Sequence, residues 1–328
     1  MGSRKTRKLK RKLLVPFDWL GIAIAMCFIP WMPRRMLFAA CDFASGVMYF
    51  FDRRGKRRSL ENLRIVRGVS THTDEPWAFD PDRSPYDATP SERKIIRRAY
   101  RNMARSVGYA FWTICRARGR CAATGEMDSR SRAFLAANRP CVTVSGHLGC
   151  WEILSQLAFL EGHAMMSVAK DIGTSGMTRL LMCARRSIGQ EIVPAEGAFK
   201  PLMAAIRGGK SLGLLVDQSV SRKSGGVWIR FFGLPFMTSP APAFFAAKAK
   251  APIIVAWSRP LKDGRYRCEF LDSIDAADAR DIRGTAQRCA DTLAKVIRRH
   301  PSCWILSYNY FRKKPTEAEV KAMEACHA

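Results

Sequence analysis

His147 and Glu152 stand five positions apart, directly after an apolar run at residues 142–144 that continues into Ser145 and Gly146. An imidazole beside a carboxylate can act as a general base, because the carboxylate fixes the ring tautomer and stabilises the imidazolium formed on proton uptake. Five positions along one helix would put the two side chains on different faces. We therefore expect His147 before a helix and Glu152 in its first turn, with the carboxylate folded back to the ring. The alternative is that Glu152 only complements the helix N-terminus and His147 is a polar turn residue.

The remaining histidines and the cysteines give weaker signals. His72, His163, His300 and His327 lie in a polar loop, at helix ends or near the C-terminus, where solvent-exposed or helix-end roles are expected. The 11 cysteines include no Cys-x-x-Cys pair, which argues against a zinc ribbon or a dithiol redox site, and several lie in apolar runs, which predicts reduced core residues in a reducing compartment. We expect no metal and no cofactor. Cys150, within the motif, allows a second mechanism in which its thiol forms a covalent intermediate, against the simpler role of a small core residue.

Short apolar runs alternate with longer periodic segments from residue 139 onward. This alternation predicts an α/β fold with a mostly parallel, twisted sheet and covering helices, and a site at the carboxyl ends of the strands. The expected strands are 141–144, 164–169, 191–194, 211–216 and 252–257, and the expected helices are 91–117, 150–160, 176–187, 197–207 and 240–250. Asp217 and Gln218 follow one of these strands, so we expect them at the same edge as His147, unless they only cap the turn.

Positive charge is concentrated near the N-terminus. The 328 residues include 55 Lys and Arg against 28 Asp and Glu, a net charge of +27, and residues 1–68 hold 16 bases against four acids. Basic runs at 4–12 and 53–58 flank apolar segments at 13–32 and 36–51. This pattern predicts attachment to an anionic membrane surface and not to nucleic acid, which needs no apolar partner. Pro16, Asp18 and Pro30 interrupt the first apolar segment, so it could span the membrane or lie in its surface.

The same patterns divide the chain into four regions. We expect a basic N-terminal membrane-anchor region with a helical segment, an acidic, proline-rich loop, an α/β domain and a C-terminal tail. Their bounds are 1–68, 69–90, 91–314 and 315–328, in that order. The loop has no periodic apolar pattern.

Several segments form an ordered set of motifs. Residues 145–152 read Ser-Gly-His-Leu-Gly-Cys-Trp-Glu, residues 213–218 end in Asp-Gln, and residues 227–238 contain Phe-Phe-Gly-Leu-Pro-Phe-Met-Thr; Asn62-Leu63, Arg185 before Gly189, and Val193-Pro194 fall in order around them. The set resembles the bacterial lipid A late acyltransferases, the lauroyl and myristoyl transferases with an H-x4-D/E motif, over about residues 13–304. The chain departs from that family in having Lys170 where an arginine is expected and Tyr308-Asn309-Tyr310 in place of a basic and aromatic pattern.

The resemblance implies transfer of a fatty acyl chain from acyl carrier protein to a hydroxyl of a membrane glycolipid, a lipid A precursor. His147 would deprotonate the hydroxyl, Glu152 would orient His147, and direct attack on the thioester would form an oxyanion. Backbone N–H groups around Gly146 and Gly149 are the expected oxyanion donors. The expected substrate-binding residues are Lys170, Arg179, Arg185, Asp217 and Gln218, and the expected acyl-channel residues, equally compatible with an ordinary core, are Phe231, Phe232 and Phe236.

Charge agrees with this reaction, because an acidic carrier protein and a phosphorylated lipid would both be drawn to a positive surface. We therefore expect the inner membrane as the location, with the catalytic domain on its cytoplasmic face. One alternative is an acyltransferase of the same frame that acts on phosphatidylinositol mannoside, ornithine lipid or a lysophospholipid. A basic, nonenzymatic peripheral membrane protein is the other, and it leaves the ordered motifs unexplained.

Overall fold

The computed structural model describes residues 27–68, 88–113, 116–169, 182–183, 185–187 and 189–325. Its helices are α2 (Arg34–Phe51), α3 (Arg53–Arg67), α4 (Pro90–Trp112), α5 (Ala117–Thr124), α6 (Ser129–Ala137), α7 (Trp151–Leu160), α9 (Phe199–Arg207), α10 (Ala241–Ala249), α11 (Ile282–Arg299) and α12 (Glu317–Ala325). Its strands are β1 (Gly125–Met127), β2 (Val142–Ser145), β3 (Met165–Ala169), β4 (Glu191–Pro194), β5 (Ser211–Leu215), β6 (Val227–Phe231), β7 (Leu234–Thr238), β8 (Ile253–Pro260) and β9 (Tyr266–Ile274). Most of the expected helix at 176–187 lies outside the described residues.

The main sheet has seven strands in the order β1-β9-β8-β2-β5-β3-β4. Every neighbouring pair is parallel except β8 and β9, which are antiparallel. The α/β fold with a mostly parallel sheet is therefore confirmed, and the five expected strands correspond to β2, β3, β4, β5 and β8. Strands β1 and β9 extend the sheet beyond that expectation.

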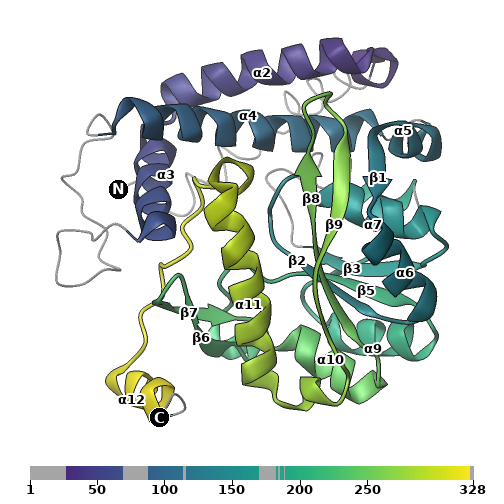
Figure 1. Cartoon of the computed structure of the whole chain (residues 1–328), viewed down its shortest axis with the longest axis vertical. Coiled ribbons are helices and arrows are strands. Elements are labelled where there is room, and N and C mark those ends of the chain that lie inside the picture. Colours follow the sequence, from purple (N-terminus) through teal and green to yellow (C-terminus); the bar gives the residue numbers. More distant parts are fainter. Residues whose placement is uncertain are drawn as a thin grey trace, which may run out of the picture.

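Both faces of the sheet are buried, which explains why its strands read as continuous apolar runs. Along β8, Ile253, Val255 and Trp257 point into a core shared with α10 and α11, while Ile254 and Ala256 point into a second core shared with α7. Helix α9 also packs on the first face, against β3 and β5, and α5 packs on α7. The result is three layers, in which Figure 1 shows α11 and α7 on different sides of β8.

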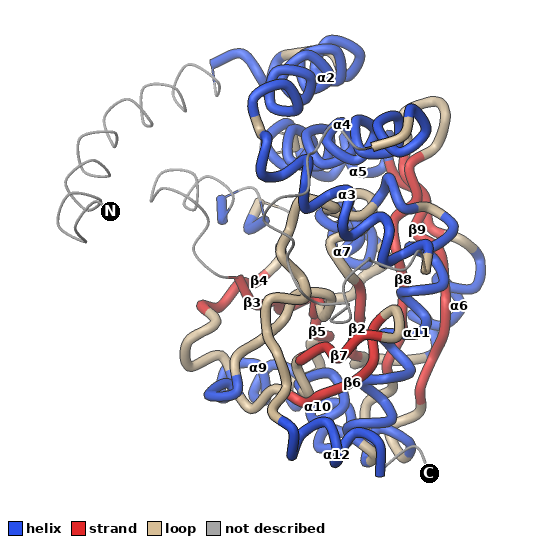
Figure 2. The backbone as a smooth tube through the Cα atoms, turned by 90° about the vertical axis from the view of Figure 1, so that its left-hand side faces the viewer, coloured by secondary structure: helices blue, strands red, loops and turns tan. Residues whose placement is uncertain are grey.

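Helices α2 and α4 lie side by side at one end of the molecule in both views (Figures 1 and 2). Leu37 and Phe38 bury the inner face of α2, and the carboxylate of Asp42 receives two hydrogen bonds of 2.6 Å from Arg105 of α4. Among the described residues, which begin after most of the first apolar segment, none of the helices has the length and apolar character needed to cross a bilayer. The membrane-associating segment expected near the N-terminus is thus not confirmed.

The phenylalanine-rich motif forms an antiparallel hairpin of β6 and β7, in which Phe231 pairs with Leu234. The two turn residues, Phe232 and Gly233, have φ values of 54° and 85°. Positive φ at both central positions is the geometry of a type I′ turn, the turn that matches the twist of paired strands. Glycine suits the second position because it has no Cβ to strain there.

Candidate functional site

The register of two parallel strands brings His147 to its carboxylate partner. Ser145 of β2 pairs with Leu215 of β5, and His147 and Asp217 each lie two residues beyond this pair. Nδ1 of His147 is 2.8 Å from Oδ1 of Asp217, and the backbone N–H of His147 donates to Oδ2 of the same carboxylate at 2.9 Å. The His147 side chain is 21% exposed and that of Asp217 is fully buried. Nδ1 is therefore bound to the carboxylate, while the other ring nitrogen, Nε2, lies 3.4 Å from the Gln218 amide.

Asp217 is held as a carboxylate by the groups around it. Burial by itself would raise the pKa of Asp217, but the charge of His147 and hydrogen bonds from His147 and Trp304 hold that pKa below its ordinary value. An ionised carboxylate at Nδ1 selects the tautomer whose Nε2 carries the free lone pair. His147 is thus arranged to accept a proton at Nε2.

The expectation that Glu152 orients His147 is corrected by this geometry. Glu152 lies in the first turn of α7, as expected, but its carboxylate accepts hydrogen bonds from Trp151 Nε1 at 3.0 Å and from Arg185 at 2.8 and 2.5 Å. The ring of Trp151 packs edge-on against the ring of His147, with centroids 5.2 Å apart. Glu152 therefore touches the imidazole only through Trp151, because helix α7 turns its carboxylate toward Arg185.

Arg185 does not have the substrate-binding position expected for it. Its guanidinium forms a two-pronged ion pair with Glu152, and the two side chains are only 13% and 6% exposed. Burial would lower the pKa of Arg185, but the hydrogen bonds and charge of Glu152 raise it. The pair is a buried internal contact. Lys170 and Arg179, expected beside it, lie outside the described residues.

The backbone N–H groups of the turn between β2 and α7 donate hydrogen bonds to acceptors within the protein. His147 donates to Asp217, Leu148 to the Gly146 carbonyl, Gly149 to the Cys303 carbonyl and Cys150 to Ser258 Oγ. An N–H that already donates within the protein has no hydrogen left for an oxyanion. The expected oxyanion role of Gly149 is therefore not supported, and that of the Gly146 N–H stays a prediction.

The two glycines shape this turn instead. Gly149 has a φ of +65°, and a Cβ on it would lie 1.7 Å from the carbonyl oxygen of Ser258. At Gly146 a Cβ would lie 3.1 Å from the carboxyl carbon of Asp217. Any side chain at these positions would push the turn away from β8 or displace the carboxylate that holds His147.

Gln218 lies beside the second ring nitrogen of His147. Its Nε2 is 3.4 Å from His147 Nε2, and its side chain is partly exposed. An amide in this position can donate to an oxygen bound at His147. Asp217 and Gln218 thus lie beside His147, at the sheet edge where the sequence placed them. Asp217 is fully buried and bonded within the protein, so the substrate-binding role expected for it is not supported, whereas that of Gln218 stays a prediction.

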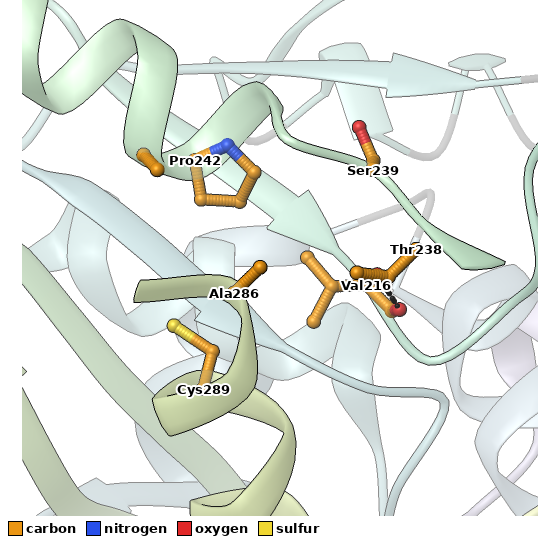
Figure 3. A pocket seen from close by; sticks show the side chains of 7 residues that line it. Val216, Thr238, Ser239, Pro242, Ala286 and Cys289 are labelled. Carbon is orange, nitrogen blue, oxygen red and sulfur yellow. Dashed lines mark hydrogen bonds between the residues drawn. The ribbon is translucent and has the colours of Figure 1, made fainter. Parts of the chain in front are cut away.

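The phenylalanines expected to line an acyl channel are packing residues of the hairpin. Phe231 and Phe236 are buried, with ring centroids 5.2 Å apart, and Phe232 packs against Phe231 and Trp304. A small, mainly apolar pocket lies beyond the end of β5, and none of these three side chains lines it (Figure 3). Its lining residues are Val216, Thr238, Ser239, Pro242, Ala243, Ala286 and Cys289.

Two further side chains are inert in this fold. The Cys150 thiol is fully buried, and burial raises its pKa to about 12. His163, expected in solvent or at a helix end, is buried, with its ring nitrogens at Ser211 Oγ and the Leu135 carbonyl. Burial lowers the pKa of His163, so the ring is neutral near pH 7. Both residues belong to the core.

Trp304 is the site residue that the sequence did not single out. Its Nε1 donates to Asp217 Oδ2 at 2.9 Å, and its side chain is 1% exposed. Apart from its position at the end of the motif set, the sequence around it gave no sign of this contact. It reaches Asp217 from a segment more than 80 positions away, which local spacing cannot predict.

A buried, ionised aspartate, an imidazole with an unprotonated Nε2 and a neighbouring amide can deprotonate a hydroxyl for attack on an acyl group. A family model described as bacterial lipid A biosynthesis acyltransferase matches residues 85–313, about two thirds of the chain. A search of curated proteins gave no match. The chain therefore belongs to the bacterial lipid A biosynthesis acyltransferase family and is an acyltransferase.

Proposed function

We propose that this acyltransferase moves a fatty acyl chain from an acyl carrier protein thioester to a hydroxyl of a lipid A precursor, with His147 as the general base. The observation that carries the proposal is the 2.8 Å contact between His147 Nδ1 and buried Asp217, which leaves Nε2 to accept a proton on a side chain that is 21% exposed. Family membership supplies the reaction class, and the resemblance of the ordered motifs to lauroyl and myristoyl transferases supplies the donor and acceptor.

The reaction follows from the atoms at this site. His147 Nε2 takes the proton of the acceptor hydroxyl as its oxygen bonds to the thioester carbonyl carbon. The carbonyl oxygen becomes an oxyanion, which then re-forms the carbonyl and breaks the carbon–sulfur bond. The departing thiolate receives the proton from the imidazolium, so His147 returns to its neutral form. Asp217 stays ionised and stabilises the imidazolium between the two steps.

We assign Gln218 the role of a hydrogen-bond donor to the bound substrate. In the free protein its amide nitrogen lies 3.4 Å from His147 Nε2, where the acceptor hydroxyl must bind. The four N–H groups of the neighbouring turn, at residues 147–150, already donate within the protein. We therefore assign the hydrogen bond to the substrate oxygen to the side-chain amide of Gln218.

Direct transfer requires no acyl-enzyme on Cys150, and this gives a testable prediction. Cys150→Ser is expected to keep kcat/KM within about threefold of wild type, because a buried thiol with a raised pKa supplies little thiolate. The measurement is thiol release from myristoyl-acyl carrier protein in the presence of a phosphorylated, hydroxyacylated glycolipid. Loss of most activity in a normally folded Cys150→Ser protein, together with an acylated Cys150 in wild type, would support the covalent route instead.

The outer face of α2 supports a location at the inner membrane. Its stripe of exposed apolar side chains follows a helical spacing, and Trp31 and Phe28 continue it before the helix. The exposed stripe consists of Met36, Phe43, Val47 and Phe50, with Phe51 beside it. Arg34 and Arg35 precede it, and the basic start of α3 follows it. An apolar stripe between basic ends suits an interfacial helix on an anionic bilayer, and the cytoplasmic face would give access to acyl carrier protein.

We predict that Phe43→Ser/Phe50→Ser lowers affinity for phosphatidylglycerol-containing vesicles about tenfold or more, since two large apolar side chains lose their contact with lipid. Phe199→Ser, which alters an exposed phenylalanine on α9, is the matched control. Vesicle co-sedimentation of the full chain measures both. Equal binding by the double variant and the control would exclude α2 as the membrane contact.

Mass spectrometry of the lipid fraction tests the proposed reaction. Cells that lose this protein should lack one fatty acyl unit on a phosphorylated glycolipid, and wild-type protein should restore it while His147→Ala should not. The missing unit on an ornithine lipid, an inositol mannoside or a lysophospholipid would assign a different acceptor to the same chemistry.

A further inference from the structure

We propose that Trp304 is a positioning residue for acyl transfer, which fixes the carboxylate of Asp217 and through it the tautomer and aim of His147. This inference rests on the proposed function and adds a third member to the His147–Asp217 pair. Trp304 Nε1 donates to Asp217 Oδ2 at 2.9 Å, on the oxygen that also receives the backbone N–H of His147.

The two donors on Oδ2 determine which way the carboxylate faces. With Oδ2 held by Trp304 and by the His147 backbone, Oδ1 is left opposite Nδ1 of the imidazole at 2.8 Å. The side chain of Asp217 is fully buried, so water cannot replace a missing donor from the bulk. Without the indole N–H, one oxygen of a buried anion would keep only the backbone donor. Its rotation would then be less restricted and its charge less well stabilised.

Trp304 is itself held firmly, as a positioning residue must be. Its ring stacks on Tyr310 with centroids 3.9 Å apart and an interplanar angle of 19°, and it meets Phe231 edge-on at 5.9 Å. Its backbone forms a bridge with Leu148, the residue after His147, and the neighbouring Cys303 carbonyl accepts the N–H of Gly149. One tryptophan therefore contacts both the turn that carries the base and the carboxylate that orients it.

Helices near the N-terminus anchor this C-terminal segment. Asn62 of α3 donates to the carbonyls of Leu306 and Tyr308 at 2.7 and 2.8 Å, and Asn102 of α4 donates to the carbonyl of Ser302 at 2.8 Å. These bonds fix the backbone on either side of Trp304. They explain how a residue far along the chain holds a constant position beneath the site.

Trp304→Phe tests the inference, because it keeps a ring and removes the N–H. Thiol release from myristoyl-acyl carrier protein, with a phosphorylated, hydroxyacylated glycolipid as acceptor, should show kcat lowered about tenfold or more and KM changed less than about twofold. A loss in kcat that leaves KM almost unchanged indicates a misplaced base, whereas weaker substrate binding would raise KM.

Trp257→Phe is the matched control. Trp257 is also 1% exposed, and its Nε1 donates to a carboxylate, that of Glu269, at 3.0 Å. The kcat and KM of the Trp257→Phe protein should stay within about twofold of wild type. If Trp304→Phe destabilises the fold, 3-benzothienylalanine at position 304 replaces N–H by sulfur in a ring of the same shape, and should give the same loss.

A double-mutant cycle separates positioning from a general packing role. In the Asp217→Asn background, Trp304→Phe should cause no further loss of kcat, because its effect passes through Asp217. Independent, multiplying losses, or a Trp304 variant equal to the Trp257 control, would overturn the inference. Full activity of His147→Ala would instead contradict the proposed function, so the two failures are distinct.

Discussion

Replacing His147 with alanine is expected to lower kcat/KM for acyl transfer by about 10²- to 10⁴-fold, the usual contribution of a general base. Its side chain is 21% exposed, and its Nδ1 lies 2.8 Å from the fully buried carboxylate of Asp217. Without it, the acceptor hydroxyl must lose its proton to water while it attacks the thioester. The measurement is the initial rate of thiol release from myristoyl-acyl carrier protein with a phosphorylated glycolipid acceptor.

His163→Ala is not a suitable control for this variant, because that ring is buried and hydrogen-bonded within the core. His300→Ala is better matched, since His300 stacks on Trp257 and does not contact the site pair. Its rate should stay close to wild type. A His147→Ala protein with wild-type kcat/KM would show that another group removes the proton.

Asp217→Asn is expected to lower kcat about 10²- to 10⁴-fold while the protein remains folded. The reason lies in the two donors at Oδ2, the Trp304 indole and the His147 backbone N–H. They require the asparagine oxygen at that position, so its NH₂ must face Nδ1 of His147. Nδ1 then accepts a hydrogen bond, the ring proton moves to Nε2, and Nε2 can no longer take a proton from the acceptor.

Glu152→Gln is the comparison that decides between the two carboxylates. Because Glu152 pairs with Arg185 and Trp151, the glutamine amide should reduce the free energy of unfolding by about 1–3 kcal/mol and lower kcat less than tenfold. Thermal unfolding and initial rates on the same preparations give both values. A larger kinetic loss in Glu152→Gln than in Asp217→Asn would restore Glu152 as the direct partner of His147.

The sequence predicted the sheet well because local patterns determine most of it. The strands that became β2, β3, β4, β5 and β8 are short apolar runs between helical segments, and burial on both faces keeps such runs uniformly apolar. Strand β9 lies largely half-buried with mixed polarity, so its pattern is weaker. The hairpin of β6 and β7 was visible only as a phenylalanine-rich motif, because Phe-Gly is not one of the dipeptides that usually form a two-residue hairpin turn.

The site was predicted in part, and the error has a clear physical source. His147 and Glu152 are neighbours in sequence, but the start of α7 carries the carboxylate away toward Arg185. Asp217 is 70 positions away and becomes a neighbour only through the register of β2 against β5. Position along a strand predicted the correct sheet edge, whereas which side chains meet there depends on a register that a single sequence does not specify. The contact of Trp304 with Asp217 joins residues that are 87 positions apart in the sequence, so it is harder still to predict.

The central claim is tested most directly by a single-turnover measurement with purified protein, myristoyl-acyl carrier protein and a phosphorylated, hydroxyacylated glycolipid, in which thiol release and ester formation are followed together. We predict one new lipid ester for each thiol released, no release without the glycolipid, and neither product with His147→Ala. Thiol release at the same rate without a lipid acceptor, or ester formation by His147→Ala at the wild-type rate, would contradict the account.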